Sequence, residues 1–273
     1  MTFSELPISC YIRTLNEERL IGEVISSAKK ICSEVVIIDS LSIDKTKSIS
    51  LSLGAIVYEQ PWLGNGFQKR VGEDKSKNDW VLDIDADELV SDEMANEIKT
   101  YFRNGAPNLD GFLTPIITVP PFGKPWYNFA KAHRVKLYNK KKIRIPAHKA
   151  WDQFKYEKLV VKKLKNGLLH PSFTGIHMHL DKLNKYSTML ANQPIKKSFA
   201  EIFIRIWFGF PVYFFHKFIL RGMFRAGTYG FALSLSSAFG RWLKDIKQFE
   251  HIMKNMVMIN PSFFLIRSKE VVK

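Results

Sequence analysis

The sequence predicts an α/β protein with a doubly wound, mostly parallel sheet and a basic, aromatic, largely helical C-terminal extension. Apolar runs alternate with helical patterns over about the first hundred residues, as expected for parallel strands with crossover helices. From Pro194 onward the chain becomes rich in aromatic and basic residues. A chain of 273 residues is long enough for one large domain with a substantial appendage.

Four apolar runs are predicted as the strands of the parallel half. They cover residues 8–13, 35–38, 55–58 and 80–82. Asn16 is predicted to cap the first helix, and Ser91 the helix that runs to Phe102. A second helix is expected from Ser42 and Asp44 to Gly54, a third over 67–75, and further strands at 111–119 and 134–139.

Charge is distributed unevenly along the chain, whose formal net charge is +15. Residues 1–120 hold 12 Lys/Arg and 19 Asp/Glu, whereas residues 121–273 hold 29 and 7. An acidic front half argues against nucleic acid as the main partner, and a basic back half suits an anionic surface such as phospholipid or a phosphorylated glycolipid. The alternative is a solvated basic face without a partner.

Two uncharged stretches in the C-terminal part, 206–215 and 226–240, are shorter than the roughly 18–20 apolar residues of a membrane-spanning helix. Basic residues flank both stretches, which favours helices that lie in the membrane interface. These flanking residues are Arg205, Lys217, Arg221, Arg225 and Arg241. Alternatively, the helices pack on the core or on a second copy of the chain. No signal peptide is expected, and Cys10 and Cys32 are interpreted as reduced core residues of a cytosolic protein.

Acidic and polar residues follow the predicted strands, at the edge where parallel sheets bind ligands. They are residues 14–17 after the first strand, Asp39 after the second, and Asp85 and Asp87 after the fourth. Two carboxylates at Asp85-x-Asp87 suit Mg²⁺ or Mn²⁺, which leaves positions open for substrate phosphates. Asp39 could accept a hydrogen bond from the imide N–H of uracil. Lys69 could contact phosphate or nucleoside, or be an ordinary surface charge.

Four sequence segments together resemble family 2 glycosyltransferases, in particular those that add sugars to the inner core of bacterial lipopolysaccharide. The segments are ISCYIRTLNEE (8–18), VVIIDSLSIDKT (35–46), QKR (68–70) and DWVLDIDADE (79–88). The resemblance implies a GT-A type fold, a nucleotide-sugar donor, a divalent metal and inversion at the anomeric carbon.

The resemblance also implies roles for individual residues. Thr14, Asn16 and Glu17 would line the nucleoside pocket, with Asp39 at the base and Lys69 in place of a family Arg or Lys. Asp85, which would also contact the donor, and Asp87 would be the metal-binding pair. His170 aligns with a family histidine that could complete the metal shell or touch the diphosphate, and a structural role for it stays open.

Two positions depart from the family pattern. Leu41 replaces a glycine, so the loop after the second strand is expected to differ. His148-Lys149 replaces a His-Glu pair whose Glu is the family's base. An inverting transfer needs a group that accepts the proton of the acceptor hydroxyl. We assign this role to Asp152, with Glu157 and His148 as alternatives.

The predicted organisation is a GT-A domain over 1–190 and a helical, membrane-interfacial extension over 191–273. Within the domain, 1–105 would form the nucleotide-sugar half and 106–190 the acceptor half. The predicted activity is metal-dependent transfer of a hexose such as glucose from UDP onto a lipopolysaccharide or lipooligosaccharide core, at the cytoplasmic face of the bacterial inner membrane. Alternatives are a polyprenyl-phosphate glycosyltransferase and a non-catalytic basic membrane adaptor. The sugar, linkage, acceptor and oligomeric state stay open.

Overall fold

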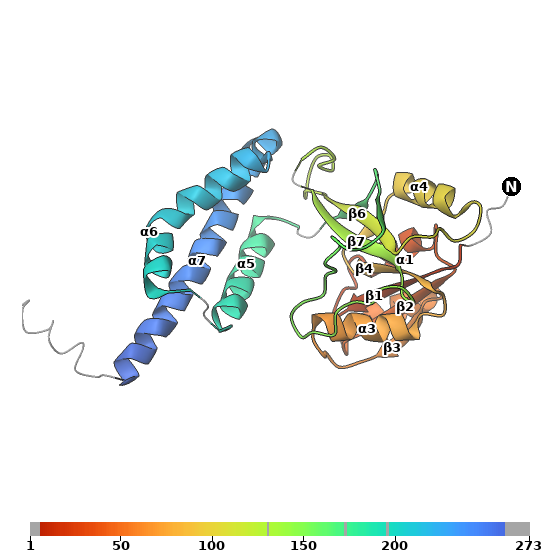
Figure 1. Ribbon diagram of the computed structural model, residues 1–273, viewed down its shortest axis with the longest axis horizontal. Coiled ribbons are helices and arrows are strands. Elements are labelled where there is room, and N and C mark those ends of the chain that lie inside the picture. Colours follow the sequence, from red (N-terminus) through yellow and green to blue (C-terminus); the bar gives the residue numbers. More distant parts are fainter. Residues whose placement is uncertain (1–5, 130, 172–173, 195–196, 260–273) are drawn as a thin grey trace, which may run out of the picture. The chain divides into compact units, whose positions relative to one another are not determined.

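The computed structural model describes residues 6–129, 131–171, 174–194 and 197–259 (Figure 1). The chain divides into two compact units, 1–172 and 173–273, which are described separately below. The boundary between the two units follows residue 172, whereas we expected the domain boundary after residue 190. Residues 176–190, which we assigned to the acceptor half, belong to a helix over 176–191 that packs against another helix of the second unit.

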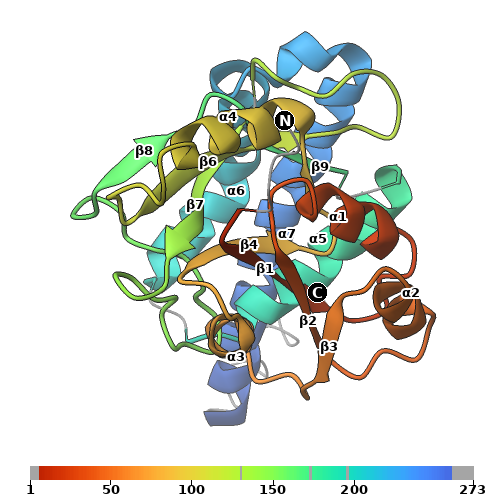
Figure 2. The same ribbon diagram turned by 90° about the vertical axis from the view of Figure 1, so that its right-hand side faces the viewer.

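Nine described strands form one sheet in the first unit, in the order β3-β2-β1-β4-β7-β6-β9-β5, with β8 beside β6. The strands are β1 (Ile8–Thr14), β2 (Glu34–Asp39), β3 (Ile56–Glu59), β4 (Trp80–Asp85), β5 (Leu89–Val90), β6 (Gly111–Thr118), β7 (Ala132–Asn139), β8 (Val161–Lys163) and β9 (Leu168–His170). Strands β3, β2, β1 and β4 are parallel and lie side by side in Figure 2. Antiparallel β7 then joins β4 to the remainder of the sheet.

Helices cover both faces of the parallel half, which confirms the doubly wound arrangement (Figure 1). They are α1 (Ile21–Ala28), α2 (Thr46–Ser52), α3 (Asn65–Lys75) and α4 (Asp92–Phe102). Apolar side chains of α1 and α4 share one core with β1 and β4, and free Cys10 and Cys32 are buried there as expected. On the opposite face, Val71 of α3 packs with Tyr11 and Tyr138.

Strand register brings the predicted polar residues to one edge of the sheet. Thr14 of β1 lies opposite Asp39 of β2, and Arg13 lies opposite Asp85 of β4. The short strand β5 pairs antiparallel with β9, with Leu89 opposite Leu169, so the chain just before β5 meets His170. The carboxyl ends of β1, β2 and β4 therefore form the floor of a common site.

Two predicted helix caps had different outcomes. The Ser91 hydroxyl accepts a hydrogen bond from the Met94 amide at 3.1 Å, which confirms it as the cap of α4. The prediction for Asn16 is wrong, because α1 begins only at Ile21 and Asn16 has a left-handed backbone with φ of 55°. The Asn16 side chain instead accepts from the Ile43 amide of the neighbouring loop at 3.0 Å.

The second unit is helical, as predicted for the C-terminal part. It contains α5 (Ile176–Ala191), α6 (Phe199–Phe215), the π-helical turn η1 (His216–Leu220), the 3₁₀ turn η2 (Met223–Ala226) and α7 (Gly227–Ile259). Both α5 and α6 pack against α7.

The length of the apolar helix in this unit differs from the prediction. Because η1 continues α6, residues 199–220 form one helix of 22 residues with a mean hydropathy of 1.3. By length and composition it is the one helix of the described chain that is suited to cross a membrane. We expected a shorter segment because we counted only the uncharged run and ended it before Lys217.

Candidate active site

A cleft of about 500 Å³ opens at the carboxyl ends of β1, β2 and β4. Its lining includes residues from all three strand ends and from the segment before α3: Arg13, Thr14, Glu17, Ser40, Trp62, Asn65, Asp85 and Asp87. Of the predicted donor-binding residues, Thr14, Glu17 and Asp85 therefore reach one cleft, together with Asp87. The volume suits a small-molecule ligand.

Asp39 contacts Thr14 of the cleft lining at the carboxyl end of β2. It is fully buried, and its carboxylate accepts from the Thr14 hydroxyl at 2.8 Å and from the Ser42 hydroxyl and amide at 2.6 and 2.7 Å. The Ser42 hydroxyl in turn accepts from the Asn16 amide at 2.9 Å. Asp39 thus ties the β1 and β2 loops together, and its direct contact with a base stays a prediction that requires the loop after β2 to move.

The loop after β2 keeps a glycine-like backbone although its sequence departs from the family. Leu41 has a φ of 67°, in the left-handed region that a glycine adopts without cost. Its side chain is half exposed, so burial contributes little there. Leu41 therefore has the backbone conformation that glycine would favour. The structure at this position does not support the expectation of a different loop.

Replacing Leu41 with glycine is expected to stabilise the protein by about 0.5–1 kcal/mol. The relief of about 1–2 kcal/mol of left-handed strain exceeds the entropy that glycine adds to the unfolded chain. Ile43→Gly is the matched control, because Ile43 is a more exposed apolar residue of the same loop without positive φ, and it should destabilise. Urea unfolding of both variants measures the difference, and equal destabilisation would show that Leu41 is unstrained.

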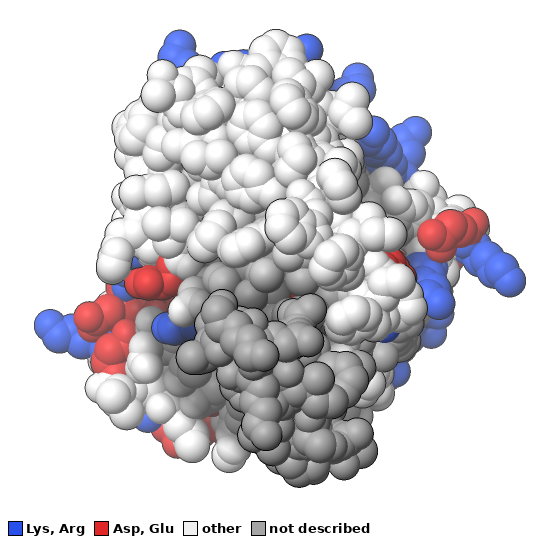
Figure 3. All heavy atoms as spheres, turned by 90° about the vertical axis from the view of Figure 1, so that its left-hand side faces the viewer, with Lys and Arg blue, Asp and Glu red and all other residues white. Residues whose placement is uncertain are grey.

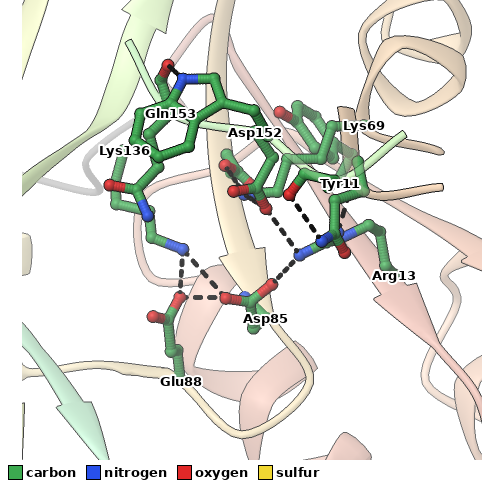
Figure 4. Close-up of polar contacts among 12 residues, drawn as sticks. Tyr11, Arg13, Lys69, Asp85, Glu88, Lys136, Asp152 and Gln153 are labelled. Atoms are coloured by element: carbon green, nitrogen blue, oxygen red, sulfur yellow. Dashed lines mark hydrogen bonds and ion pairs between the residues drawn. The ribbon is translucent and has the colours of Figure 1, made fainter. Parts of the chain in front are cut away.

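A network of charged side chains crosses the floor of the cleft (Figure 4). Arg13 donates to Asp85 Oδ1 at 2.6 Å, and Lys136 of β7 lies 3.3 Å from Asp85 Oδ2 and 2.7 Å from Glu88. Glu88 also accepts from the Asp85 amide at 2.9 Å. Both carboxylate oxygens of Asp85 are therefore held by cations, and Arg13 Nε is buried without an acceptor among the described residues.

The network shifts the ionisation of its members. Burial alone would raise the pKa of Asp85, but the charges of Lys136, Lys69 and Arg13 outweigh burial and hold that pKa well below its usual range. Burial likewise opposes the charge on Lys136, yet Asp85 and Glu88 raise its pKa above the usual value. Burial raises the pKa of Glu88. Asp85 is thus kept ionised, which leaves it unable to donate a proton.

Asp87 and His170 form the part of the site best suited to a metal ion. Asp87 Oδ2 lies 3.2 Å from His170 Nε2, and both side chains are about a quarter exposed. Neighbouring ligands of an octahedral ion with bonds of about 2.1 Å lie about 3 Å apart, so this pair could bind one ion. The described residues hold no group of three or more metal-ligating side chains. The remaining positions would fall to phosphate and water, as is usual for Mg²⁺.

Lys69 and Asp152 lie together beside the cleft, in a cavity of about 20 Å³ (Figure 4). Lys69 is buried, with its ammonium 2.6 Å from Asp83 and 3.3 Å from Asp152. Asp152 is also 3.5 Å from the Arg13 guanidinium, which joins the cavity to the cleft. Lys69, which we predicted to face the donor, therefore forms an ion pair with Asp152, the predicted base.

The segment before Asp152 is fixed to the start of α3. The Asn65 and Gly66 amides donate to the carbonyls of Lys149 and His148 at 2.8 and 2.9 Å. A β-carbon on Gly66 would lie 2.1 Å from the Pro146 carbonyl oxygen, so only glycine permits this approach. The Gly64-Asn65-Gly66 turn thus positions the loop that carries Asp152.

The two alternative bases have less suitable positions. His148 Nδ1 accepts from the Ala150 and Trp151 amides at 3.1 and 2.9 Å, which makes it a turn-stabilising residue. Glu157 is exposed and does not line the cleft or the cavity.

Arg13 and Lys136 were missed in the sequence. Arg13 could have been found, because it directly precedes Thr14 at a strand end and parallel pairing places it beside Asp85. Lys136 lies between Val135 and Leu137 in a predicted strand, and only the antiparallel pairing of β4 with β7 shows that it reaches the same carboxylate.

Comparison with known proteins identifies the class of enzyme to which this doubly wound domain and its acidic cleft belong, the glycosyltransferases. Residues 9–182 match glycosyl transferase family 2, and the chain belongs to that family. It is 37% identical over 260 residues to an uncharacterized glycosyltransferase of Rickettsia bellii, covering 88% of this chain and 85% of that one. It is 28% identical over 261 residues to the lipopolysaccharide core biosynthesis glycosyltransferase LpsC of Rhizobium meliloti, covering 92% and 95%.

Two solved structures are also similar. S. aureus TarS 1–349 in complex with UDP-GlcNAc is 16% identical with a TM-score of 0.48, covering 91% of this chain and 92% of that one. Glucosyl-3-phosphoglycerate synthase of Mycobacterium tuberculosis, in complex with Mn²⁺, UDP and glucosyl-3-phosphoglycerate, is 15% identical with a TM-score of 0.44, covering 69% and 81%.

Proposed function

We propose that this glycosyltransferase transfers a hexose, such as glucose, from a UDP-sugar to a lipopolysaccharide or lipooligosaccharide core, with inversion at the anomeric carbon. The observation that carries the proposal is the cleft that joins Thr14 and Glu17 to Asp85 and Asp87. A nucleoside bound beside Thr14 and Glu17 would direct its diphosphate toward Asp85 and Asp87. The relative named for lipopolysaccharide core biosynthesis supports the acceptor class.

In the proposed transfer, an acceptor hydroxyl oxygen attacks the anomeric carbon as the bond from that carbon to the UDP oxygen breaks. The hydroxyl proton passes to the Asp152 carboxylate, and UDP leaves with the bonding electron pair. Lys69 and Arg13 hold Asp152 in position from two sides. Arg13 lines the cleft, and its guanidinium is also suited to donate to the departing diphosphate.

We further propose that Asp87 and His170 hold Mg²⁺ or Mn²⁺. Asp85, which we predicted to form the metal-binding pair with Asp87, is held by Arg13 and Lys136 in this structure, so its part in metal binding requires those ion pairs to rearrange. When bound, the ion would neutralise charge that develops on the diphosphate.

The activity is tested with the purified full-length chain, radiolabelled UDP-glucose and either lipid A–core or polyprenyl phosphate. The expected result is labelled lipid A–core whose new linkage has the anomeric configuration opposite to that of the donor. Transfer to polyprenyl phosphate alone would contradict the proposed acceptor. Such an enzyme needs no base, because a phosphate acceptor is already deprotonated.

The charged, basic chain is also compatible with a non-catalytic membrane adaptor, the alternative from another functional class. The cleft argues for the enzyme, because an adaptor has no need for ionised carboxylates beside an open cavity of this size. If no tested UDP-sugar binds to the purified chain, the adaptor is the better account.

A further inference from the structure

The helical unit contains a pocket of its own, of about 500 Å³, among α5, α6, η1 and α7. Four cationic side chains contribute to its lining: Arg205, Lys217, Arg241 and Lys244. His179, Tyr186 and Ser237 add polar groups, and Leu183 and Leu190 add an apolar wall.

The positive charge of this pocket is only partly compensated. Asp245 is fully buried and lies 3.2 Å from Arg205 and 2.9 Å from Lys244. Among the residues that the structure describes, no carboxylate lies within 4.0 Å of Lys217 or Arg241. Within the described part of the chain, two of the four cations therefore lack an anionic partner.

Lys217 and Arg241 are held by uncharged groups instead. The Lys217 ammonium donates to the Ser237 hydroxyl at 2.5 Å, and the Arg241 guanidinium lies 5.2 Å from the Tyr213 ring centre. Lys217 belongs to η1. π-Helical turns are rare in proteins, and those that occur are often found at functional sites. Burial and the charges of Arg241 and Arg221 lower the pKa of Lys217 to about 8. An anion in the pocket would relieve this repulsion.

Helix α6, which precedes η1, has an apolar face that is exposed. Phe203, Ile204, Trp207, Phe208, Val212 and Phe215 are each between 49% and 67% exposed. Figure 3 shows a broad surface without charged side chains, with Lys and Arg at its margins together with some Asp and Glu. An apolar helix face beside basic groups is the arrangement by which interfacial helices hold anionic lipids.

We propose that the pocket lined by Arg205, Lys217, Arg241 and Lys244 binds the phosphate group of an anionic membrane lipid, whose acyl chains contact the exposed apolar face of α6. Arginine and lysine N–H groups together provide charge-assisted donors to phosphate oxygens. This inference concerns the helical unit alone and does not depend on the proposed sugar transfer.

Site-resolved acetylation of the full-length chain tests the occupant. The chain is pulsed with an amine-acetylating reagent alone, with phosphatidylcholine vesicles, with vesicles that also contain phosphatidic acid, or with soluble glycerol 3-phosphate at the same phosphate concentration. Mass spectrometry then measures acetylation of Lys217 against the exposed Lys185 and Lys254. We expect phosphatidic acid vesicles to slow modification of Lys217 at least about tenfold more than that of the two controls, because only Lys217 would be ion-paired in a pocket.

A pair of matched double variants tests the site by vesicle flotation. K217Q/R241Q removes the two uncompensated cations, and K185Q/K254Q removes the same charge from exposed positions. The pocket pair should lower partition onto phosphatidic acid vesicles about tenfold more than the control pair, because diffuse attraction depends only on charge number. Circular dichroism confirms that each variant is folded. Equal losses in both pairs, or protection of Lys217 by glycerol 3-phosphate as strong as that by vesicles, would overturn the proposal.

Discussion

Replacing Asp152 with asparagine is expected to lower kcat by about 10²–10⁴, the usual contribution of a general base. The amide occupies the same space but cannot accept the acceptor hydroxyl proton. Donor affinity should change little, because Asp152 lines the cavity beside the cleft and not the cleft itself. Initial rates with saturating acceptor and calorimetric titration of UDP-glucose measure the two effects separately.

Glu157→Gln is the matched control, because Glu157 is the alternative base and is exposed. It should keep the wild-type rate. Asp152→Asn also weakens contacts with Lys69 and Arg13, so thermal unfolding of both variants must accompany the kinetics. A wild-type kcat in Asp152→Asn, or a loss confined to Glu157→Gln, would move the base away from Asp152.

Replacing Asp87 with asparagine is expected to lower kcat/KM about a thousandfold, because a bound cation contributes several kcal/mol to stabilising the leaving diphosphate. Asp87 faces His170 at 3.2 Å, so His170→Ala should show a loss in the same direction. Electron paramagnetic resonance of free Mn²⁺, with UDP present, measures whether the variants bind the metal more weakly.

Asp92→Asn serves as the control for this series. Asp92 is an exposed carboxylate at the start of α4 that pairs with Lys30 at the surface. It should leave both Mn²⁺ binding and turnover unchanged. Full activity of the wild-type chain in EDTA would contradict a metal-dependent transfer, whatever the variants show.

The parallel half of the fold could be predicted from sequence because its signals are local. Each strand there is an apolar run that ends in a polar residue, and Ser91 has the hydroxyl and position of a helix cap. The same reasoning placed Asp39, Asp85 and Asp87 at one edge, since the carboxyl ends of parallel strands share an edge. Thr14, Glu17 and Asp85 did meet in one cleft.

The other features depend on pairing between distant segments. Arg13 and Lys136 meet Asp85 only through the neighbours of β4, and periodicity within each strand does not show those neighbours. The cap prediction for Asn16 failed because its side chain binds a loop 27 residues away in sequence. The helix over 199–220 was judged too short because charged positions within it were read as ends, whereas Arg205 is held by Asp245.

The most direct test is a crystal structure of the chain with UDP-glucose and Mn²⁺, with anomalous scattering used to place the metal. We predict an anomalous peak bonded to Asp87 Oδ2 and His170 Nε2, with the uridine beside Thr14 and Glu17. A nucleotide bound outside this cleft, or Mn²⁺ bound without contact to Asp87, would contradict the account.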